Sequence, residues 1–81
     1  METSKSVITI NDYGKITVHI REIMDSKGGM TRNYLAKAAN TRFEVIDKWY
    51  NGQLEKMDLD VLARICYVLD CSPADIIKYN K

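Results

Sequence analysis

Apolar residues recur at helical spacing through most of the chain, and the first such stretch begins near residue 17. The residues that fit one face of a helix here are Ile16, Ile20, Ile23 and Met24. Ile16, Val18 and Ile20 also alternate with polar residues, as in a strand. The helix is the better interpretation, because Gly28-Gly29 is a typical helix stop. We therefore predict a helix that begins near Thr17 and ends at these glycines.

The residues before this helix have a different pattern. The run Val7-Ile8-Thr9-Ile10 fits an extended segment, and Asn11-Asp12-Tyr13-Gly14 is rich in turn formers. We predict that residues 1–16 form an extended or strand-like N-terminal arm and that residues 17–81 form one helical domain. The apolar run has no place in a helical core, so we expect it to pack as a strand on its own domain or to pair with a second copy of the chain.

Two short helices with a tight turn between them follow. Thr31 is a favourable N-cap for the first of them, because its hydroxyl can accept a hydrogen bond from an amide of the first turn. The apolar stripe of this helix is expected to comprise Tyr34, Leu35, Ala38 and Ala39. Asn40 tolerates the left-handed backbone conformation that a tight turn needs. The next helix is expected from Arg42 to Tyr50, and Asn51-Gly52 ends it.

This third helix has one apolar and one polar face. Ile46 and Trp49 lie three positions apart and are expected to face the core. The residues expected to face away from the core are Arg42, Phe43, Glu44, Asp47 and Lys48. An exposed Phe beside an Arg on so short a helix favours a contact surface.

Two further helices complete the domain. Asp58 is expected to cap a fourth helix, and Ser72-Pro73-Ala74-Asp75 has the arrangement of a capping box at the start of a fifth. The apolar residues of the fourth helix that recur on one face are Leu62, Ile65, Cys66 and Leu69. Ile76 and Ile77 are expected to anchor the fifth helix. Five short helices joined by short turns predict an all-α domain.

Length and composition fit one small soluble domain. The chain has 81 residues, of which 46% are hydrophobic and 28% charged, which excludes a disordered chain. Its apolar runs are far shorter than the roughly 20 residues of a membrane span, and its start lacks the features of a signal peptide. We therefore expect a cytoplasmic protein. The net charge of +1 is compatible with phosphate contact but does not by itself indicate it.

The residues that carry chemistry are too few for a catalytic or metal site. The only thiols are those of Cys66 and Cys71, and the only imidazole is that of His19. These three residues are scattered along the sequence. A four-coordinate zinc site needs more ligands of this kind, so Cys66 is interpreted as a small apolar residue of a helix and Cys71 as lying just beyond it. We expect no enzyme activity, no metal, no cofactor and no small-molecule ligand.

The ordered features from Met30 to Tyr79 resemble the Xre-type (phage repressor and Cro-like) helix-turn-helix domain. The matching segments are TRNYLAKAAN, VIDKWYNG and LDVLARICYVLDCSPADII, which correspond to the second helix, the recognition helix and the two closing helices of that family. The resemblance implies a five-helix, lambda-repressor-like domain with its helix-turn-helix unit at residues 31–51. Asn40 departs from the family pattern, which usually has Gly, and Thr41 stands where an apolar residue is usual.

This resemblance implies a transcriptional regulator, a repressor as the first choice, that binds a specific duplex DNA sequence with helix 42–50 in the major groove. The groove-facing positions that it implies are Arg42, Phe43, Glu44, Asp47 and Lys48. The positions that it implies for contact with the DNA backbone are Thr31, Arg32, Asn51 and Gly52. Double-stranded DNA is the implied partner, and a homodimer is the assembly to test.

The carboxylates of this helix have two interpretations. Glu44 or Asp47 can accept a hydrogen bond from cytosine N4, and a carboxylate in the groove rejects wrong bases. They can equally belong to a solvated surface, with Glu44 and Lys48 as an i,i+4 pair, and for Asp47 we favour this second interpretation. The near-neutral charge leaves another function open: a protein-interaction or anti-repressor module on the same fold that does not read DNA.

Overall fold

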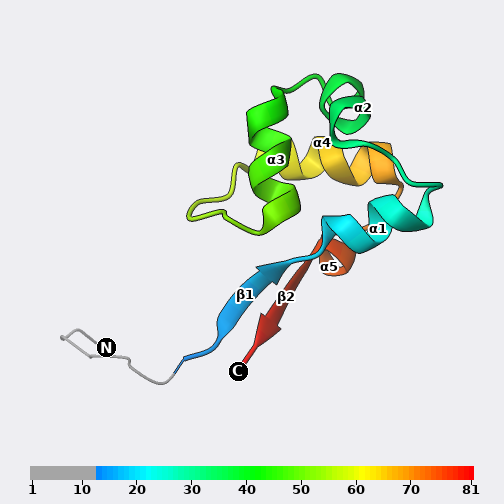
Figure 1. The fold of residues 1–81 in the computed structure, drawn as a ribbon. Coiled ribbons are helices and arrows are strands. Elements are labelled where there is room, and N and C mark those ends of the chain that lie inside the picture. Colours follow the sequence, from blue (N-terminus) through cyan, green and yellow to red (C-terminus); the bar gives the residue numbers. More distant parts are fainter. Residues whose placement is uncertain (1–12) are drawn as a thin grey trace.

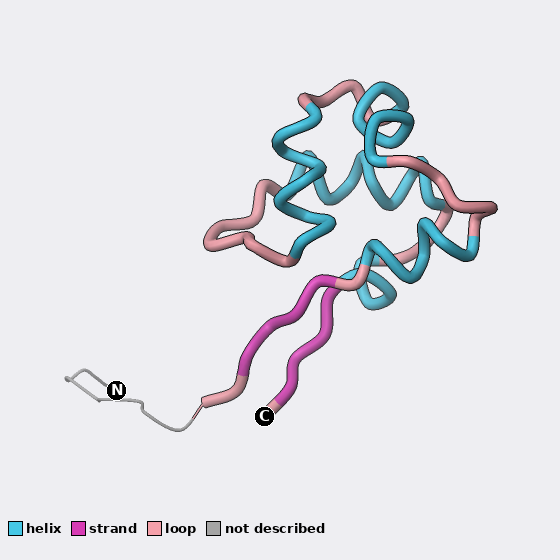
Figure 2. The backbone as a smooth tube through the Cα atoms, viewed as in Figure 1, coloured by secondary structure: helices cyan, strands magenta, loops and turns pink. Residues whose placement is uncertain are grey.

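The computed structural model describes residues 13–81, which form a cluster of helices with a two-stranded ribbon (Figure 1). The elements in chain order are β1 (Lys15–Val18), α1 (Ile20–Ser26), α2 (Arg32–Ala38), α3 (Phe43–Asn51), α4 (Leu59–Leu69), α5 (Pro73–Ile76) and β2 (Ile77–Asn80). The ribbon extends away from the helices, and the C-terminus lies at its far end (Figure 2). The predicted five-helix fold with a strand-like segment before it is confirmed. None of the described helices is long and apolar enough to cross a membrane.

The hydrophobic core draws residues from every helix. Its most buried side chains are Ile20, Met24, Leu35, Ile46, Trp49, Ile65, Leu69 and Ile76. Trp49 is only 1% exposed, and Ile46 on the same face of α3 is fully buried. Their predicted inward direction is therefore confirmed. Because these two side chains fix the rotation of α3, the opposite face of this helix is turned to solvent.

The helix ends follow the local signals in the sequence. The Thr31 hydroxyl accepts from the Tyr34 amide at 3.1 Å, and one Asp58 carboxylate oxygen accepts from the amides of Asp60 and Val61. The predicted capping box at the start of α5 is present, with Ser72 and Asp75 bonded to each other. These caps satisfy amides that have no partner within the helix.

The first helix begins at Ile20, later than the sequence predicted. Residues 15–18 are strand β1, which pairs antiparallel with β2 over its whole length. The helical interpretation of Thr17 and Val18 is therefore wrong, and their alternation with Ile16 was the correct signal. The physical reason is the partner strand, which comes from the opposite end of the chain and offers hydrogen bonds that no local pattern reveals.

Two other details also differ from the expectation. The fifth helix ends at Ile76, and Ile77 already belongs to β2, so Ile77 does not anchor a helix. In the predicted apolar stripe of α2, Leu35 and Ala39 are buried as expected, but Tyr34 and Ala38 are exposed. Ala36, which was not expected in the stripe, is buried. A small residue at this position lets α2 approach its neighbour closely. The expectation for Val7 to Ile10 concerns residues that lie outside the described part of the chain.

Candidate nucleic-acid interface

Helices α2 and α3 form the helix-turn-helix unit. Asn40 adopts the left-handed conformation with φ of 52°, as the sequence predicted, and the Thr41 amide then donates to the Ala36 carbonyl at 2.9 Å. The Arg64 guanidinium of α4 donates to the Asn40 carbonyl at 2.9 Å. The turn is therefore held both by its own backbone and by a side chain from the core helix beneath it.

The outward face of α3 carries the residues that the resemblance implies for base contact. Arg42 is the N-cap, in an extended conformation, so the helix itself starts one residue later than expected and runs to Asn51. Glu44 and Lys48 are exposed, and Phe43 keeps 39% of its surface in solvent. Within residues 13–81, the side chains of Arg42, Glu44 and Lys48 form no ion pair with another side chain. These side chains are free to adapt to a partner surface.

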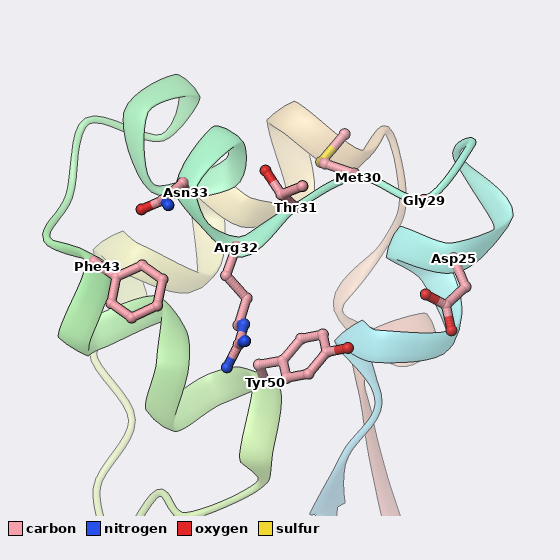
Figure 3. A pocket seen from close by; sticks show the side chains of 8 residues that line it. All are labelled: Asp25, Gly29, Met30, Thr31, Arg32, Asn33, Phe43 and Tyr50. Carbon is pink, nitrogen blue, oxygen red and sulfur yellow. The ribbon is translucent and has the colours of Figure 1, made fainter.

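Asp47 is held by a neighbouring helix instead of facing solvent alone. The Arg32 guanidinium, at the start of α2, donates to Asp47 Oδ1 at 2.6 Å. The same guanidinium lies 5.6 Å from the Phe43 ring centroid and 4.8 Å from that of Tyr50 (Figure 3). One ion pair and two cation–π contacts therefore position Arg32 between α2 and α3.

Tyr50 and Arg21 belong to this cluster, and sequence reasoning missed both. The Arg21 guanidinium, from α1, lies 4.5 Å from the Tyr50 ring centroid. Tyr50 was treated only as the last residue of the third helix, and Arg21 was not singled out. The signal was weak, because nothing in the local sequence shows that α1 reaches the end of α3.

A surface cleft of about 370 Å³ opens beside Arg32 and Tyr50. Figure 3 shows the side chains that line it. Its lining includes Asp25 of α1, Asn33 of α2 and the N-cap Thr31, together with Arg32, Phe43 and Tyr50. The cleft is therefore lined both by Arg32, which the family resemblance implies for contact with the DNA backbone, and by Phe43, which it implies for contact with the bases. Asp25 adds a carboxylate at the α1 side, so the cleft is polar and of mixed charge.

Asn51 and Gly52, the other implied backbone positions, lie at the far end of α3. Gly52 ends the helix with φ of 69°, and the Gln53 amide donates back to the Lys48 carbonyl at 2.9 Å. Asn51 and Gly52 line a second shallow cleft together with Arg21 and Glu22. The pKa of Glu22 is lowered chiefly by its hydrogen bond with His19 Nδ1, at 3.1 Å. Glu22 therefore remains charged beside this cleft at neutral pH.

The thiols lie away from these clefts. Cys66 and Cys71 are both free, and each is partly buried against the core, as the sequence interpretation had them. Burial raises the pKa of the Cys71 thiol, so it stays protonated at neutral pH. Among residues 13–81, no group of three or more His, Cys, Asp and Glu side chains is placed to hold a metal ion.

Comparisons with known proteins agree with this geometry. The sequence model of the Cro/C1-type HTH DNA-binding domain matches residues 19–81. A crystal structure of the transcriptional regulator VanUg is similar, with a TM-score of 0.69 and 20% sequence identity, and the match covers 93% of this chain and 97% of that one. At this identity the likeness shows the fold alone. No curated protein sequence matches the chain. The chain belongs to the Cro/C1-type helix-turn-helix DNA-binding domain family, and it is a non-enzymatic, DNA-binding protein.

Proposed function

We propose that this protein is a cytoplasmic transcriptional repressor that reads a specific duplex DNA sequence with α3 in the major groove. The observation that carries the proposal is the orientation of α3, whose inner face is locked by Ile46 and Trp49. The outer face then presents exposed donor, acceptor and aromatic side chains. An α-helix with such a face fits the width of the major groove. Repression needs no more than occupancy of a site that overlaps a promoter.

Base recognition by this face follows from its functional groups. Arg42 and Lys48 can donate to guanine O6 and N7, Glu44 can accept from cytosine N4, and Phe43 can pack on a thymine methyl. Asp47 has a different role in this proposal, because its carboxylate is already engaged by Arg32. It positions a cation at the edge of the interface and is not counted among the base-reading residues.

Backbone contacts would fix how the helix enters the groove. Thr31 and Arg32 lie at the start of α2, while Asn51 and Gly52 lie at the end of α3. The Arg32 guanidinium lies beside the outer face of α3, against Asp47 and the Phe43 and Tyr50 rings, and Asn51 and Gly52 follow at the end of that helix. Contacts at both places would set the register of the helix on the duplex without reading its sequence.

Three substitutions on α3 test this function. Arg42→Ala and Lys48→Ala are each expected to weaken binding to the preferred site by about 1–3 kcal/mol and to relax discrimination at one base pair. Glu44→Gln is expected to raise affinity for arbitrary duplex, because it removes a charge that repels phosphates while keeping the shape of the side chain. The measurement is a fluorescence titration of each variant against one selected site and one scrambled duplex. Wild-type behaviour of all three variants on both duplexes would contradict the proposed role of α3.

We propose further that the protein acts as a homodimer, through the surface around β1. Ile16 and Tyr79 face each other across the ribbon, and both are 59% exposed. Ile16 also lines a mainly apolar groove of about 330 Å³ with Met57 and Ile77. Exposed apolar side chains that gather on one surface are typical of an interaction site. Two copies related by a two-fold axis would match two half-sites one helical turn apart.

Deletion of residues 1–12 tests the assembly. We expect the truncated chain to melt at a lower temperature or to shift from dimer to monomer, because the apolar run that precedes β1 has been removed. Light scattering after size-exclusion chromatography gives the mass, and circular dichroism gives the melting curve. An unchanged mass together with an unchanged melting temperature would argue against a role of these residues in assembly.

A further inference from the structure

The two strands of the ribbon gather their polar side chains on one face. Lys15 and Thr17 point to the same face of β1, because side chains two positions apart in a strand share a face. On β2, Lys78 lies directly opposite Thr17, and Asn80 Nδ2 donates to Thr17 Oγ1 at 2.9 Å. These four residues form the polar ribbon face, and the exposed apolar side chains of the ribbon lie on the other face.

The polar ribbon face is cationic. Lys15 and Lys78 are both exposed, and β1 and β2 contain no Asp or Glu. Within residues 13–81, neither lysine forms an ion pair. The acid closest to Lys78 in the sequence is Asp75, and its carboxylate accepts instead from the amide and the hydroxyl of Ser72. Both ammonium groups are therefore available for an external anion.

A hydrogen bond connects the polar ribbon face with the cleft at the end of α3. Thr17 Oγ1 and His19 Nε2 lie 2.7 Å apart. His19 lines that cleft together with Asn51 and Gly52, which the family resemblance implies for contact with the DNA backbone. The polar ribbon face therefore begins at the edge of the surface that the proposed function assigns to the DNA backbone.

We propose that the polar ribbon face is an additional contact with the DNA backbone, in which Lys15 and Lys78 bind phosphates outside the base pairs that α3 reads. This inference rests on the proposed function and adds the ribbon to the DNA interface. The cleft itself offers no excess of positive charge, because Glu22 lines it together with Arg21. The ribbon has two cations and no acid, so phosphates are attracted there, and a lysine ammonium binds them without reading bases.

The test combines salt dependence with neutralisation of single phosphates. The full chain and the double variant Lys15→Ala/Lys78→Ala are titrated against the selected and the scrambled duplex over a series of salt concentrations. The double variant is expected to bind both duplexes roughly tenfold more weakly, and its slope of log K against log salt should be smaller by about 2. Methylphosphonate linkages, which carry no charge, are then placed one at a time along the selected duplex. At the contacted linkages they should weaken the wild type and leave the double variant unaffected.

Matched variants separate a ribbon contact from other causes. Lys15→Arg/Lys78→Arg keeps both charges and should retain binding, and melting curves identify variants that have unfolded. Lys37→Ala removes an exposed cation of α2 and is expected to leave affinity unchanged. Wild-type affinity and slope of the double alanine variant would overturn the ribbon contact with the proposed function intact. Equal effects of every neutralised linkage on both chains would also overturn it, whereas a wild-type chain that binds neither duplex would overturn both proposals.

Discussion

Replacing Trp49 with alanine is expected to destabilise the domain by about 3–5 kcal/mol, because the change leaves a large cavity at the centre of the core. Trp49 is 1% exposed and is the largest of the fully buried side chains. It packs in one cluster with Ile20 of α1, Leu35 of α2 and Ile65 of α4. A loss of this size is a large part of the total stability of so small a domain, so the variant should be largely unfolded at 37 °C.

Denaturant unfolding followed by circular dichroism measures this effect. Tyr67→Ala is the matched control, because it removes another aromatic ring from a helix but one that is 88% exposed. It should change the free energy of unfolding by no more than about 0.5 kcal/mol. If Trp49→Ala melts near the wild type and loses only DNA binding, Trp49 is a contact residue and the assigned rotation of α3 is wrong.

Replacing Arg32 with alanine is expected to weaken DNA binding by about 3 kcal/mol, more than the loss of an ordinary phosphate contact. The variant loses a charge-assisted hydrogen bond to the DNA backbone. In the wild-type chain the Asp47 carboxylate is paired with Arg32 at 2.6 Å. The variant leaves this carboxylate without its cation, beside the DNA phosphates. The loss should be similar for selected and scrambled duplexes, because neither effect depends on the base sequence.

The double variant Arg32→Ala/Asp47→Asn separates these two contributions. It lacks both the cation and the carboxylate, so it should bind DNA more tightly than Arg32→Ala alone. Titration at two salt concentrations against both duplexes measures the difference, and Lys37→Ala serves as the surface control. If the double variant binds no better than Arg32→Ala, Asp47 exerts no repulsion and the ion pair is not part of the interface.

The features that could be predicted from the sequence are those set by local spacing. Three such features depend on residues within a few positions: the helix caps at Thr31 and Asp58, and the left-handed backbone of Asn40. The structure has all three. The inward face of α3 follows from the period of the helix alone. This period was also sufficient to place Glu44 and Lys48 on the solvent side.

The features that could not be predicted depend on contacts between distant segments. β1 is a strand because β2 lies beside it, and the sequence near Ile77 signalled only the continuation of a helix. Similarly, Asp47 pairs with Arg32 across the helix-turn-helix unit, whereas the local pattern offered only neighbours on its own helix. The contact of Arg21 with Tyr50 requires the packing of α1 against α3, which is a property of the assembled core.

Selection from a pool of random duplexes tests most directly whether α3 reads DNA sequence. The wild-type chain is incubated with the pool at low and moderate salt, the bound duplexes are sequenced, and the enriched site is titrated beside a scrambled duplex. We expect one enriched site, with a Kd on the order of 10⁻⁸ M at moderate salt and a preference over the scrambled duplex of at least about 10³-fold. A pool without enrichment, with no duplex bound more tightly than about 10⁻⁶ M at moderate salt, would contradict DNA reading by α3 and favour a protein-interaction module on this fold.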